Sequence, residues 1–478
     1  MLEQKLLDLV HRIARDKKSE DNDIEFKAAK DGIPKVYDTL SSFSNQDQGG
    51  IILFGIDENH SYEPCGVKDL AALSKGIEAQ CDEMRPIVRA KLTSATENGR
   101  SFLAAEIPPL PYASRPCFYA GIGMQKGSYI RVGQADKKMT PYEVYAYESY
   151  RDGVRDDLDP VPELEDSLMD QDALKMFLLK ARMGKGASVQ GLSDEQVLEL
   201  MGVKSHGIYT KAACLCFCYY PQRFFPRLGV SCVATEADSL GNDAFEAKRF
   251  EDSAFVGGNI AAMLDDGTSW IRKNLKVRTF ISPETGKRED REEIPINALR
   301  EALLNALAHR DYGKMTSSLP ISVECYGDRV EIKSPGHLYG DADLSELGET
   351  RLPNRNETLL GILEIMGTME NRFSGVPTMR KSMDSYGLEE PEFVYRHDDF
   401  CVVFRKKESH AKEMDLKQRI LDYCETPRTR DELIAFTGMS RYYTMSVLVK
   451  SLIQDGKIEL SDPDHPASRK QTYRTIEE

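Results

Sequence analysis

A charged stretch that carries two prolines, residues 151–172, divides this chain of 478 residues. Aspartates stand at positions 156, 157 and 159, directly before Pro160 and Pro162. Dense like charge opposes burial and proline cannot donate a backbone hydrogen bond, so this composition is typical of a linker. At roughly 150 residues per domain, the length allows about three domains. We therefore expect several separate hydrophobic cores rather than one.

The overall composition indicates a soluble, cytoplasmic protein. The formal net charge is -15, and the ten cysteines show no framework of short spacings, which favours reduced thiols in a cytosol. No apolar run reaches about 18 residues, so no membrane span is expected. Residues 1–17 alternate leucines with charges as an amphipathic helix rather than a secretion signal. The acidic charge argues against one large basic nucleic-acid platform but leaves room for a small one.

The first block, up to about residue 148, places acids and a lysine close together. Residues 51–56 are apolar throughout and lie between Gly49-Gly50 and Asp57-Glu58, as in a buried strand. In the stretch before it, Glu25 and Lys27 flank Phe26 and so share the opposite face of an extended segment. Carboxylates beside a lysine can bind a hard divalent cation and stabilise phosphate charge. A surface salt bridge between Glu25 and Lys27 is the simpler interpretation.

These residues resemble a known domain. The spacing of Glu20, Glu25 and Lys27, the run at 42–45 and the glycines at 49–57 resemble the Schlafen-type AlbA-like domain. Its later signature resembles Arg115-Pro116 and residues 126–133. In nuclease members two glutamates and an aspartate form a metal-dependent site that cuts RNA. The resemblance implies Glu20, Glu25 and Asp57 as metal ligands for Mg²⁺ or Mn²⁺, with Lys27 beside them as a catalytic residue.

The same resemblance leaves other roles open. Many bacterial relatives with this motif are DNA-binding regulators, and the motif residues could simply organise the opening strand. Arg115 and Arg131 offer phosphate pairing and Tyr129 offers a stacking surface, so all three are candidates for nucleic-acid binding. Ordinary solvation of a strand face is the alternative for these side chains.

The middle block contains a group of three cysteines. Residues 213–220 are predicted to form a strand with Cys214, Cys216 and Cys218 on one face. Successive same-face side chains of a strand lie about 7 Å apart, which does not suit a tetrahedral metal site. We therefore expect these thiols to pack in a core.

The middle block also contains a helix with a polar line. Residues 296–312 are predicted as a helix, with Pro295 suited to its first turn. Glu301, Asn305 and His309 recur every four residues and so share one face. A carboxylate and an amide one turn apart can orient a water and a magnesium ion near a triphosphate. A network of hydrogen bonds between elements is the alternative.

This helix resembles the Glu-x3-Asn helix of the GHKL class of ATP-binding domains, in the divergent form found behind Schlafen-type domains. Residues 328–336, 355–356 and 372–379 follow in that family's order. The resemblance implies a water-activating Glu301, a magnesium ligand in Asn305, and ATP as cofactor. The implied nucleotide contacts are Glu301, Asn305, His309, Asp311, Gly336, Ser374 and Gly375. The chain lacks the Asp-x-Gly-x-Gly motif and keeps only Ser374-Gly375 of the glycine-rich lid, so nucleotide binding and hydrolysis stay open.

The last block reads as a winged helix-turn-helix. Helices are predicted at residues 416–423, at 429–436 with Thr429 as N-cap, and from Ser440, followed by a hairpin at 456–474. In such a module the second helix of the motif enters the major groove and the wing reaches the backbone. The predicted nucleic-acid contacts are Arg441, Tyr442, Lys450, Arg469 and Lys470. Asp462 and Asp464 oppose that role, and winged helices also bind proteins.

Together these patterns predict an α+β, multidomain protein. The expected parts are an N-terminal helix (1–17), a Schlafen AlbA-like domain (18–148), a linker and helix (149–190), a GHKL-like α/β sandwich (191–408) and a winged helix (411–478). The leading hypothesis is a nucleotide-responsive, nucleic-acid-binding regulator like bacterial ATP-binding transcriptional regulators related to RecG. The alternative is a metal-dependent endoribonuclease acting on tRNA or other RNA in stress or antiphage defence. A protein that only makes assembly contacts is a third class. We expect a homo-oligomer that binds DNA or RNA and no membrane.

Overall fold

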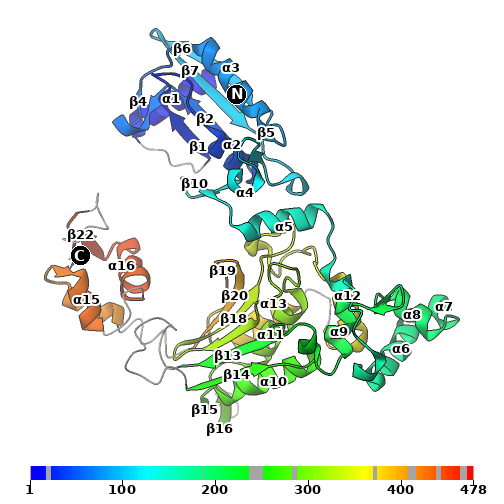
Figure 1. The fold of residues 1–478 in the computed structure, drawn as a ribbon. Coiled ribbons are helices and arrows are strands. Elements are labelled where there is room, and N and C mark those ends of the chain that lie inside the picture. The colour runs from blue at the N-terminus through cyan, green and yellow to red at the C-terminus, as the bar shows by residue number, and fades with distance from the viewer. Residues whose placement is uncertain are drawn as a thin grey trace. The chain divides into compact units, whose positions relative to one another are not determined.

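The chain folds into two compact units, shown in Figure 1. The computed structural model describes residues 2–17, 23–185, 187–235, 251–281, 288–369, 374–406, 416–437, 443–462 and 471–476. Unit 1 comprises Met1–Val154 with Tyr339–Ala342, and unit 2 comprises Arg155–Leu338 with Asp343–Glu478. The predicted fold class, α+β and multidomain, is confirmed. Among the residues described, no helix combines the length and apolar composition that crossing a bilayer requires.

Unit 1 is built on a four-stranded sheet with helices on both faces. The strand order is β1 (Ile24–Lys27), β2 (Gly50–Phe54), β7 (Arg100–Ile107) and β6 (Lys91–Glu97), with β1 parallel to β2 and the other pairs antiparallel. Leu53 packs against the apolar face of α1 (Glu3–Asp16), whereas Ile52 and Phe54 pack on the side of α2 (Tyr37–Ser44) and α3 (Leu70–Asp82). Both faces of β2 are therefore buried, which explains why its sequence is apolar without alternation.

The rest of unit 1 is made of short elements that follow the sheet. They are β3 (Ile56–Asp57), β4 (Glu63–Pro64), β5 (Met84–Arg85), β8 (Phe118–Tyr119), α4 (Met124–Gly127), β9 (Tyr129–Val132), β10 (Ala135–Lys138) and α5 (Pro141–Arg151). Strands β9 and β10 form an antiparallel hairpin in which Arg131 lies opposite Asp136 and Tyr129 opposite Lys138. Gly133 occupies the turn with φ of 60°, a conformation that favours glycine.

Unit 2 contains a six-stranded mixed sheet covered on one face by helices (Figure 1). The strand order is β14 (Asp252–Val256), β13 (Val230–Ala234), β17 (Ile321–Cys325), β18 (Arg329–Pro335), β20 (Asp399–Arg405) and β19 (Glu392–Arg396). The helices are α10 (Ile260–Lys273), α11 (Ile296–His309) and α13 (Gly375–Ser385). Leu303 and Leu307 of α11 share a core with Ile332 and Phe404 of the sheet. The predicted helix after Pro295 is confirmed. A separate two-stranded hairpin is formed by β15 (Val277–Ile281) and β16 (Arg288–Glu292).

Part of the stretch predicted as a linker is buried in unit 2, although residues 151–153 are exposed and the boundary between the two units falls at residues 154–155. Asp157 is fully buried, and its Oδ2 accepts hydrogen bonds from the backbone N–H groups of Thr358 (2.8 Å) and Leu359 (3.2 Å). These are the first turn of α12 (Glu357–Met366), so the carboxylate lies at the positive end of a helix. Only the fold could reveal this partner, since it is some 200 residues away along the chain.

A small helical region of unit 2 follows this stretch. Its elements are α6 (Gln171–Lys185), α7 (Ala187–Gln190), α8 (Asp194–Leu200), the hairpin β11 (Lys204–Ser205) and β12 (Ile208–Tyr209), and α9 (Lys211–Phe217). The predicted strand at 213–220 was therefore wrong, because most of it is helix α9. Thr210 caps this helix by accepting a hydrogen bond from Ala213 N, and the helix is buried on nearly every side, so no helical period shows in its sequence. Cys214 and Cys218 pack in the core, as expected.

The C-terminal segment has its own small core. Its elements are a helix at residues 416–423, β21 (Arg428–Thr429), α15 (Arg430–Thr437), helical turns at Tyr443–Val449 that run into α16 (Lys450–Gln454), β22 (Ile458–Leu460) and β23 (Thr472–Thr475). The sheet order is β21, β23, β22. Thr429 caps α15 as predicted, since Glu432 N donates to its Oγ1 and Glu432 Oε2 accepts from its backbone N–H at 2.8 Å. The element order agrees with the predicted winged helix, which stays a prediction.

Candidate nucleic-acid and nucleotide sites

Glu25 and Lys27 form an ion pair on β1, on the strand face opposite Phe26. Lys27 Nζ lies 2.7 Å from Glu25 Oε1, which is the salt bridge expected from their alternation. The other carboxylate oxygen of Glu25 lies 3.0 Å from Arg131 Nη1 of strand β9. Phe26 meanwhile packs in the core beneath α1. Strand β1 thus places the Glu25 carboxylate between the side chains of Lys27 and Arg131, both of which are part of unit 1.

Arg131, a predicted nucleic-acid contact, is used inside unit 1. Only 4% of its side chain is exposed, and its guanidinium also pairs with Asp136 at 2.8 Å. Asp136 in turn accepts hydrogen bonds from Ser42 Oγ (2.6 Å) and Thr39 Oγ1 (2.8 Å) on α2. This buried chain of charges ties the β9–β10 hairpin to β1 and α2. Its position favours a structural role for Arg131 over contact with phosphate.

Asn45, within the motif at 42–45, joins α2 to two other chain segments, at Cys117 and at Tyr129. Its side chain donates to the backbone oxygens of Cys117 and Tyr129, each at 3.0 Å, and accepts from Cys117 N at 2.6 Å. Ser41 Oγ accepts from Tyr129 N at 2.8 Å. An asparagine can satisfy both a donor and an acceptor in this way, as a buried backbone requires. The motif therefore anchors the start of β9.

Arg115 and Tyr129 occupy different surroundings. Arg115 is 6% exposed and donates to the backbone oxygens of Leu110 and Gln46 at 3.0 and 3.1 Å, with an ion pair to Asp47 at 2.7 Å. These contacts fix the loop before β8. Tyr129 is half-buried, and desolvation raises the pKa of its hydroxyl.

Of the three predicted metal carboxylates the structure describes two, Asp57 and Glu25, and each of them is paired with cations of unit 1. Asp57 is buried and pairs with Lys30 Nζ at 2.6 Å and with His60 Nδ1 at 2.9 Å, and the hydrogen bond from Lys30 lowers its pKa. Glu25 has its own two partners. Glu20 lies outside the described residues. Among the described side chains, no group of three or more His, Cys, Asp or Glu has the arrangement of a metal site.

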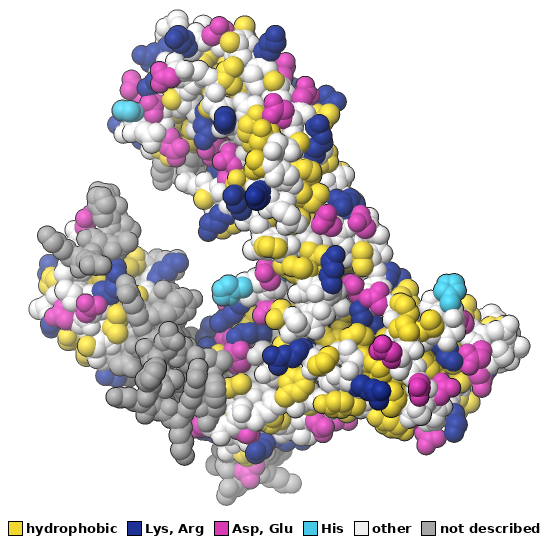
Figure 2. Space-filling model, viewed as in Figure 1, with side chains coloured by type: hydrophobic (Ala, Val, Ile, Leu, Met, Phe, Trp, Pro, Cys, Tyr) yellow, Lys and Arg dark blue, Asp and Glu magenta, His cyan; other side chains and the backbone are white. Residues whose placement is uncertain are grey.

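Exposed lysines that were not among the predicted contacts lie on the β9–β10 hairpin and on the neighbouring helix α4. Lys137 and Lys138 are exposed on β10, Lys126 is exposed on α4, and Val132 is 48% exposed at the turn. Figure 2 shows Lys and Arg side chains at the end of unit 1 where β10 and α4 lie. The two adjacent lysines are visible in the sequence, directly after Asp136, which pairs with Arg131.

In unit 2 the predicted nucleotide residues of α11 lie beneath the start of α13. Asn305 Nδ2 lies 3.4 Å from Glu301 Oε1, and both side chains are half-buried. A Cβ added at Gly375 would lie 2.7 Å from Glu301 Oε1 and 2.9 Å from Asn305 Nδ2. Ser374 is the residue directly before that helix. The fold therefore brings Glu301, Asn305, Ser374 and Gly375 together.

His309 ends α11 and keeps an accessible ring although protein surrounds it. Burial lowers the pKa of its imidazole to about 4. At neutral pH the ring is therefore uncharged and offers one donor and one acceptor.

Asp311 and Gly336, both predicted nucleotide contacts, make interactions within unit 2 itself. Asp311 is 1% exposed, forms a close ion pair with Arg355 and accepts a hydrogen bond from Gly313 N at 2.8 Å. Gly336 has φ of 106°, and its backbone bonds with Asp398 and Phe400 continue the pairing of β18 with β20. Both residues are thus committed to structure in this conformation.

The residues around α11 fit the phosphate and metal end of a nucleotide better than its base. Asn305 and Glu301 supply hard oxygen donors of the kind that Mg²⁺ prefers, and the backbone N–H groups at the start of α13 suit a phosphate. Asp311 is paired with Arg355 and offers no free carboxylate to adenine. A bound magnesium would neutralise phosphate charge, while Glu301 and Asn305 would hold it and orient water.

Of the predicted contacts in the C-terminal segment, Lys450 is exposed at the start of α16. Arg441, Tyr442, Arg469 and Lys470 lie outside the described residues.

Comparison with known families identifies two domains in the chain. Residues 20–140 match the family model described as "Schlafen, AlbA_2". Residues 319–404 match the model described as "Putative ATP-dependent DNA helicase recG C-terminal". The chain therefore carries a Schlafen AlbA_2 domain followed by a RecG-type C-terminal, ATPase-like domain, as the two resemblances implied; the second match begins after α11, so the roles of Glu301 and Asn305 stay predictions.

Two solved structures are similar to the chain at low identity. The DIP2311 protein of Corynebacterium diphtheriae shares 17% identity, with 99% of this chain and 97% of that chain covered and a TM-score of 0.41. The N-terminal domain of a Nitrosomonas europaea protein titled "Putative ATP-dependent DNA Helicase RecG-related Protein" shares 24% identity over 28% of this chain and 93% of its own, with a TM-score of 0.23. No curated protein matches the chain.

Proposed function

We propose that this protein binds nucleic acid through its Schlafen AlbA_2 domain, responds to a nucleotide or another ligand in its ATPase-like domain, and regulates transcription. The observation that carries the proposal is the β9–β10 hairpin. It projects exposed lysines from a base fixed by the buried Arg131–Asp136 pair. A rigid two-stranded ribbon with basic side chains has the width of a DNA major groove.

In this proposal the affinity for nucleic acid comes from a local patch of lysines. The chain as a whole has a net charge of -15, so its overall field repels phosphate. Lys126, Lys137 and Lys138 supply positive charge at one end of unit 1. Binding through such contacts releases counterions, and its affinity therefore falls as salt rises.

The experiment is fluorescence anisotropy of the full chain with a labelled DNA duplex and with tRNA, over a range of salt. For duplex DNA, each phosphate contact contributes about 0.9 to the slope of log K against log salt. The Lys137→Gln, Lys138→Gln variant should therefore reduce that slope by about 2 and weaken binding at every salt concentration.

A matched control is Lys75→Gln, Lys91→Gln, which removes two exposed lysines from α3 and β6 of the same domain. It should keep the wild-type slope. Absence of any shift with DNA or RNA at low salt would end the proposal. An equal loss in both variants would show that only the net charge matters.

A metal-dependent endoribonuclease is a second candidate, and the contact between Lys27 and Glu25 at 2.7 Å favours it. A lysine held beside a carboxylate could stabilise the charge that develops on a scissile phosphate. The test is cleavage of purified tRNA with Mg²⁺ or Mn²⁺ against EDTA, with a Glu25→Gln, Asp57→Asn variant alongside. Discrete fragments that need metal and vanish in the variant would support it, and intact tRNA throughout would exclude it.

A further inference from the structure

The implied nucleotide contacts fall into two groups along α11. Glu301 and Asn305 lie against the start of α13, where a Cβ built on Gly375 would come within 3.0 Å of both side chains. This group suits the phosphates and their metal ion. The other group lies at the C-terminal end of α11 or beside it, and it comprises His309, Asp311 and Gly336. A base attached to those phosphates would therefore lie on the side of His309.

Polar groups on that side are already bonded within unit 2. The Asp311 carboxylate pairs with an arginine. Ser334 Oγ donates to a backbone oxygen of α11 at 3.4 Å, and both backbone groups of Gly336 are bonded, to partners 2.9 and 3.0 Å away. Leu338 N donates to the hydroxyl of Tyr395 at 3.3 Å. Strong discrimination between similar ligands needs polar groups aimed at their differing atoms, and these groups are used elsewhere.

His309 is exposed on this side, but its ring suits any base. The imidazole is uncharged at neutral pH, so one ring nitrogen donates a hydrogen bond and the other accepts one. The two tautomers exchange these roles. The ring can therefore adapt to the edge of a purine or a pyrimidine.

A pair of aromatic rings lies on the same side. The ring centroids of His337 and Tyr395 are 4.5 Å apart, and Tyr395 is 39% exposed. Tyr395 shares its strand face with Phe393, which packs on the core beneath the helices, so its ring lies on the α11 side of the sheet. Its hydroxyl is bonded to Leu338, which leaves the ring face for a ligand. Every base has a π-face, so stacking accepts all bases.

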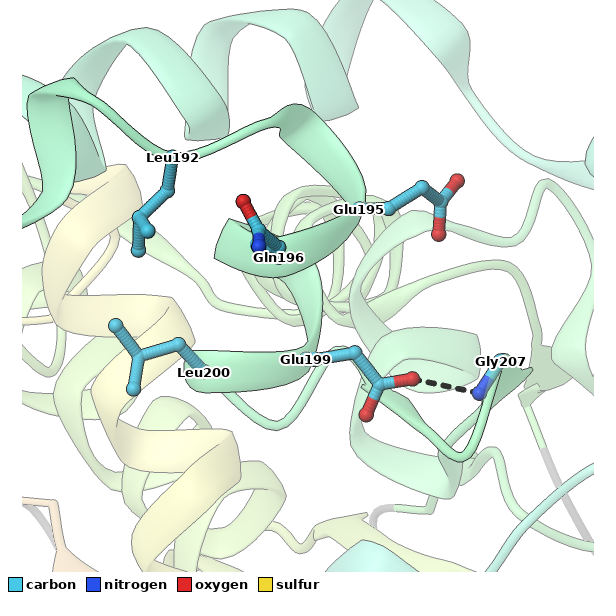
Figure 3. A pocket seen from close by; sticks show the side chains of 6 residues that line it. All are labelled: Leu192, Glu195, Gln196, Glu199, Leu200 and Gly207. Carbon is cyan, nitrogen blue, oxygen red and sulfur yellow. Dashed lines mark hydrogen bonds between the residues drawn. The ribbon is translucent and has the colours of Figure 1, made fainter.

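The pocket on α8 does not suit a triphosphate (Figure 3). It is lined by Leu192, Glu195, Gln196, Glu199, Leu200 and Gly207. The backbone N–H groups of His206 and Gly207 already donate to Glu199, at 3.2 and 2.6 Å. Two carboxylates at the rim would also repel phosphate charge. The site on α11 is therefore the better candidate.

We infer that the ATPase-like domain takes Mg²⁺-bound nucleoside triphosphates of any base, held by their phosphates and by stacking of the base on His337 and Tyr395. The inference rests on the proposed nucleotide response of this domain and names the ligand class. The phosphates are held at Glu301, Asn305 and the start of α13. The base adds affinity without adding selectivity.

Isothermal titration calorimetry on the full chain, with Mg²⁺ and ATP, GTP, CTP or UTP, tests the inference. The four Kd values should agree within about tenfold. Inorganic tripolyphosphate should bind the same site more weakly and compete with all four. Asn305→Ala should weaken the nucleotides and tripolyphosphate by a similar factor, because all of them share the phosphate contacts.

Tyr395→Ala removes the proposed stacking surface. It should weaken all four nucleotides by about fivefold or more and leave tripolyphosphate unchanged. The matched control is Tyr395→Phe, which keeps the ring, loses only the hydroxyl bond to Leu338 and should bind as the wild type does. Circular dichroism and thermal unfolding check that each variant is folded.

Two results would overturn the inference and leave the proposed function standing. One is a preference for ATP over the other three nucleotides of more than about 100-fold, the mark of polar groups that read the base. The other is unchanged nucleotide affinity in folded Tyr395→Ala. Absence of binding by every triphosphate would remove the inference together with the response to nucleotide.

Discussion

At the scale of single residues, Arg131 shows how a side chain suited to phosphate can be needed elsewhere. Its guanidinium lies between Glu25 and Asp136, at 3.0 and 2.8 Å, with almost no exposed surface. Removing one partner of a buried ion pair leaves an uncompensated charge, which costs more than the pair itself contributes. The hydroxyls of Thr39 and Ser42 can stabilise Asp136 only in part.

Arg131→Met should therefore lower the free energy of unfolding by about 3 kcal/mol, which urea denaturation can measure. Lys27→Met is the matched control, because Lys27 pairs with the same Glu25 but is 31% exposed. It should cost no more than about 1 kcal/mol. Equal effects of the two variants would show that the burial of Arg131 adds nothing.

At the scale of elements, the contact between α11 and α13 depends on one glycine. Gly375 lets the start of α13 lie against Glu301 and Asn305, where a Cβ would come within 3.0 Å of both side chains. Gly361 in α12 offers the opposite case, because nothing lies within 4 Å of a Cβ built there. Both glycines have helical backbone conformations, and they differ only in the atoms that a side chain would meet.

Gly375→Ala should lower the free energy of unfolding by about 1 kcal/mol, the low end of the cost of overpacking, because the methyl group displaces only the side-chain ends of Glu301 and Asn305. Gly361→Ala should raise it by about 0.5–1 kcal/mol, since alanine loses less backbone entropy in a helix. Thermal unfolding of both variants measures whether each substitution raises or lowers the free energy of unfolding. A gain in stability for Gly375→Ala would mean that α13 is not packed on the Glu301–Asn305 pair.

At the scale of the whole molecule, a ligand-responsive regulator requires coupling between two binding events. If nucleotide binding in the ATPase-like domain changes nucleic-acid affinity, nucleic acid must change nucleotide affinity by the same factor. This reciprocity follows from thermodynamic linkage and needs no assumption about how the two units are arranged.

Mg²⁺-ATP should therefore change the Kd for nucleic acid by about 5- to 150-fold, the usual range of such coupling. Asn305→Ala should abolish that change while nucleic-acid binding without ATP stays as in the wild type. Asn274→Ala, an amide at the end of α10, is the control and should keep the ATP effect. Nucleic-acid affinity that is indifferent to ATP would remove the sensor role.

The sequence by itself determined several local elements and the two domain families. The strand at β2 was predictable from an apolar run between glycines, and α11 was predictable from its period and from Pro295. The ion pair of Glu25 with Lys27 followed from strand alternation. Each of these features depends on neighbours within a few residues, so the chain's periodicity carries them.

Only the tertiary structure decided which polar side chains are buried in ion pairs and hydrogen bonds that stabilise the fold. Asp157 accepts a hydrogen bond at a helix terminus some 200 residues away. Arg131 forms an ion pair with Glu25, and Asp311 forms one with Arg355. Helix α9 escaped prediction because burial on nearly every side erases its period. In each case the partner is distant in sequence, and a charge leaves water only where the fold supplies a partner of opposite charge or a helix end.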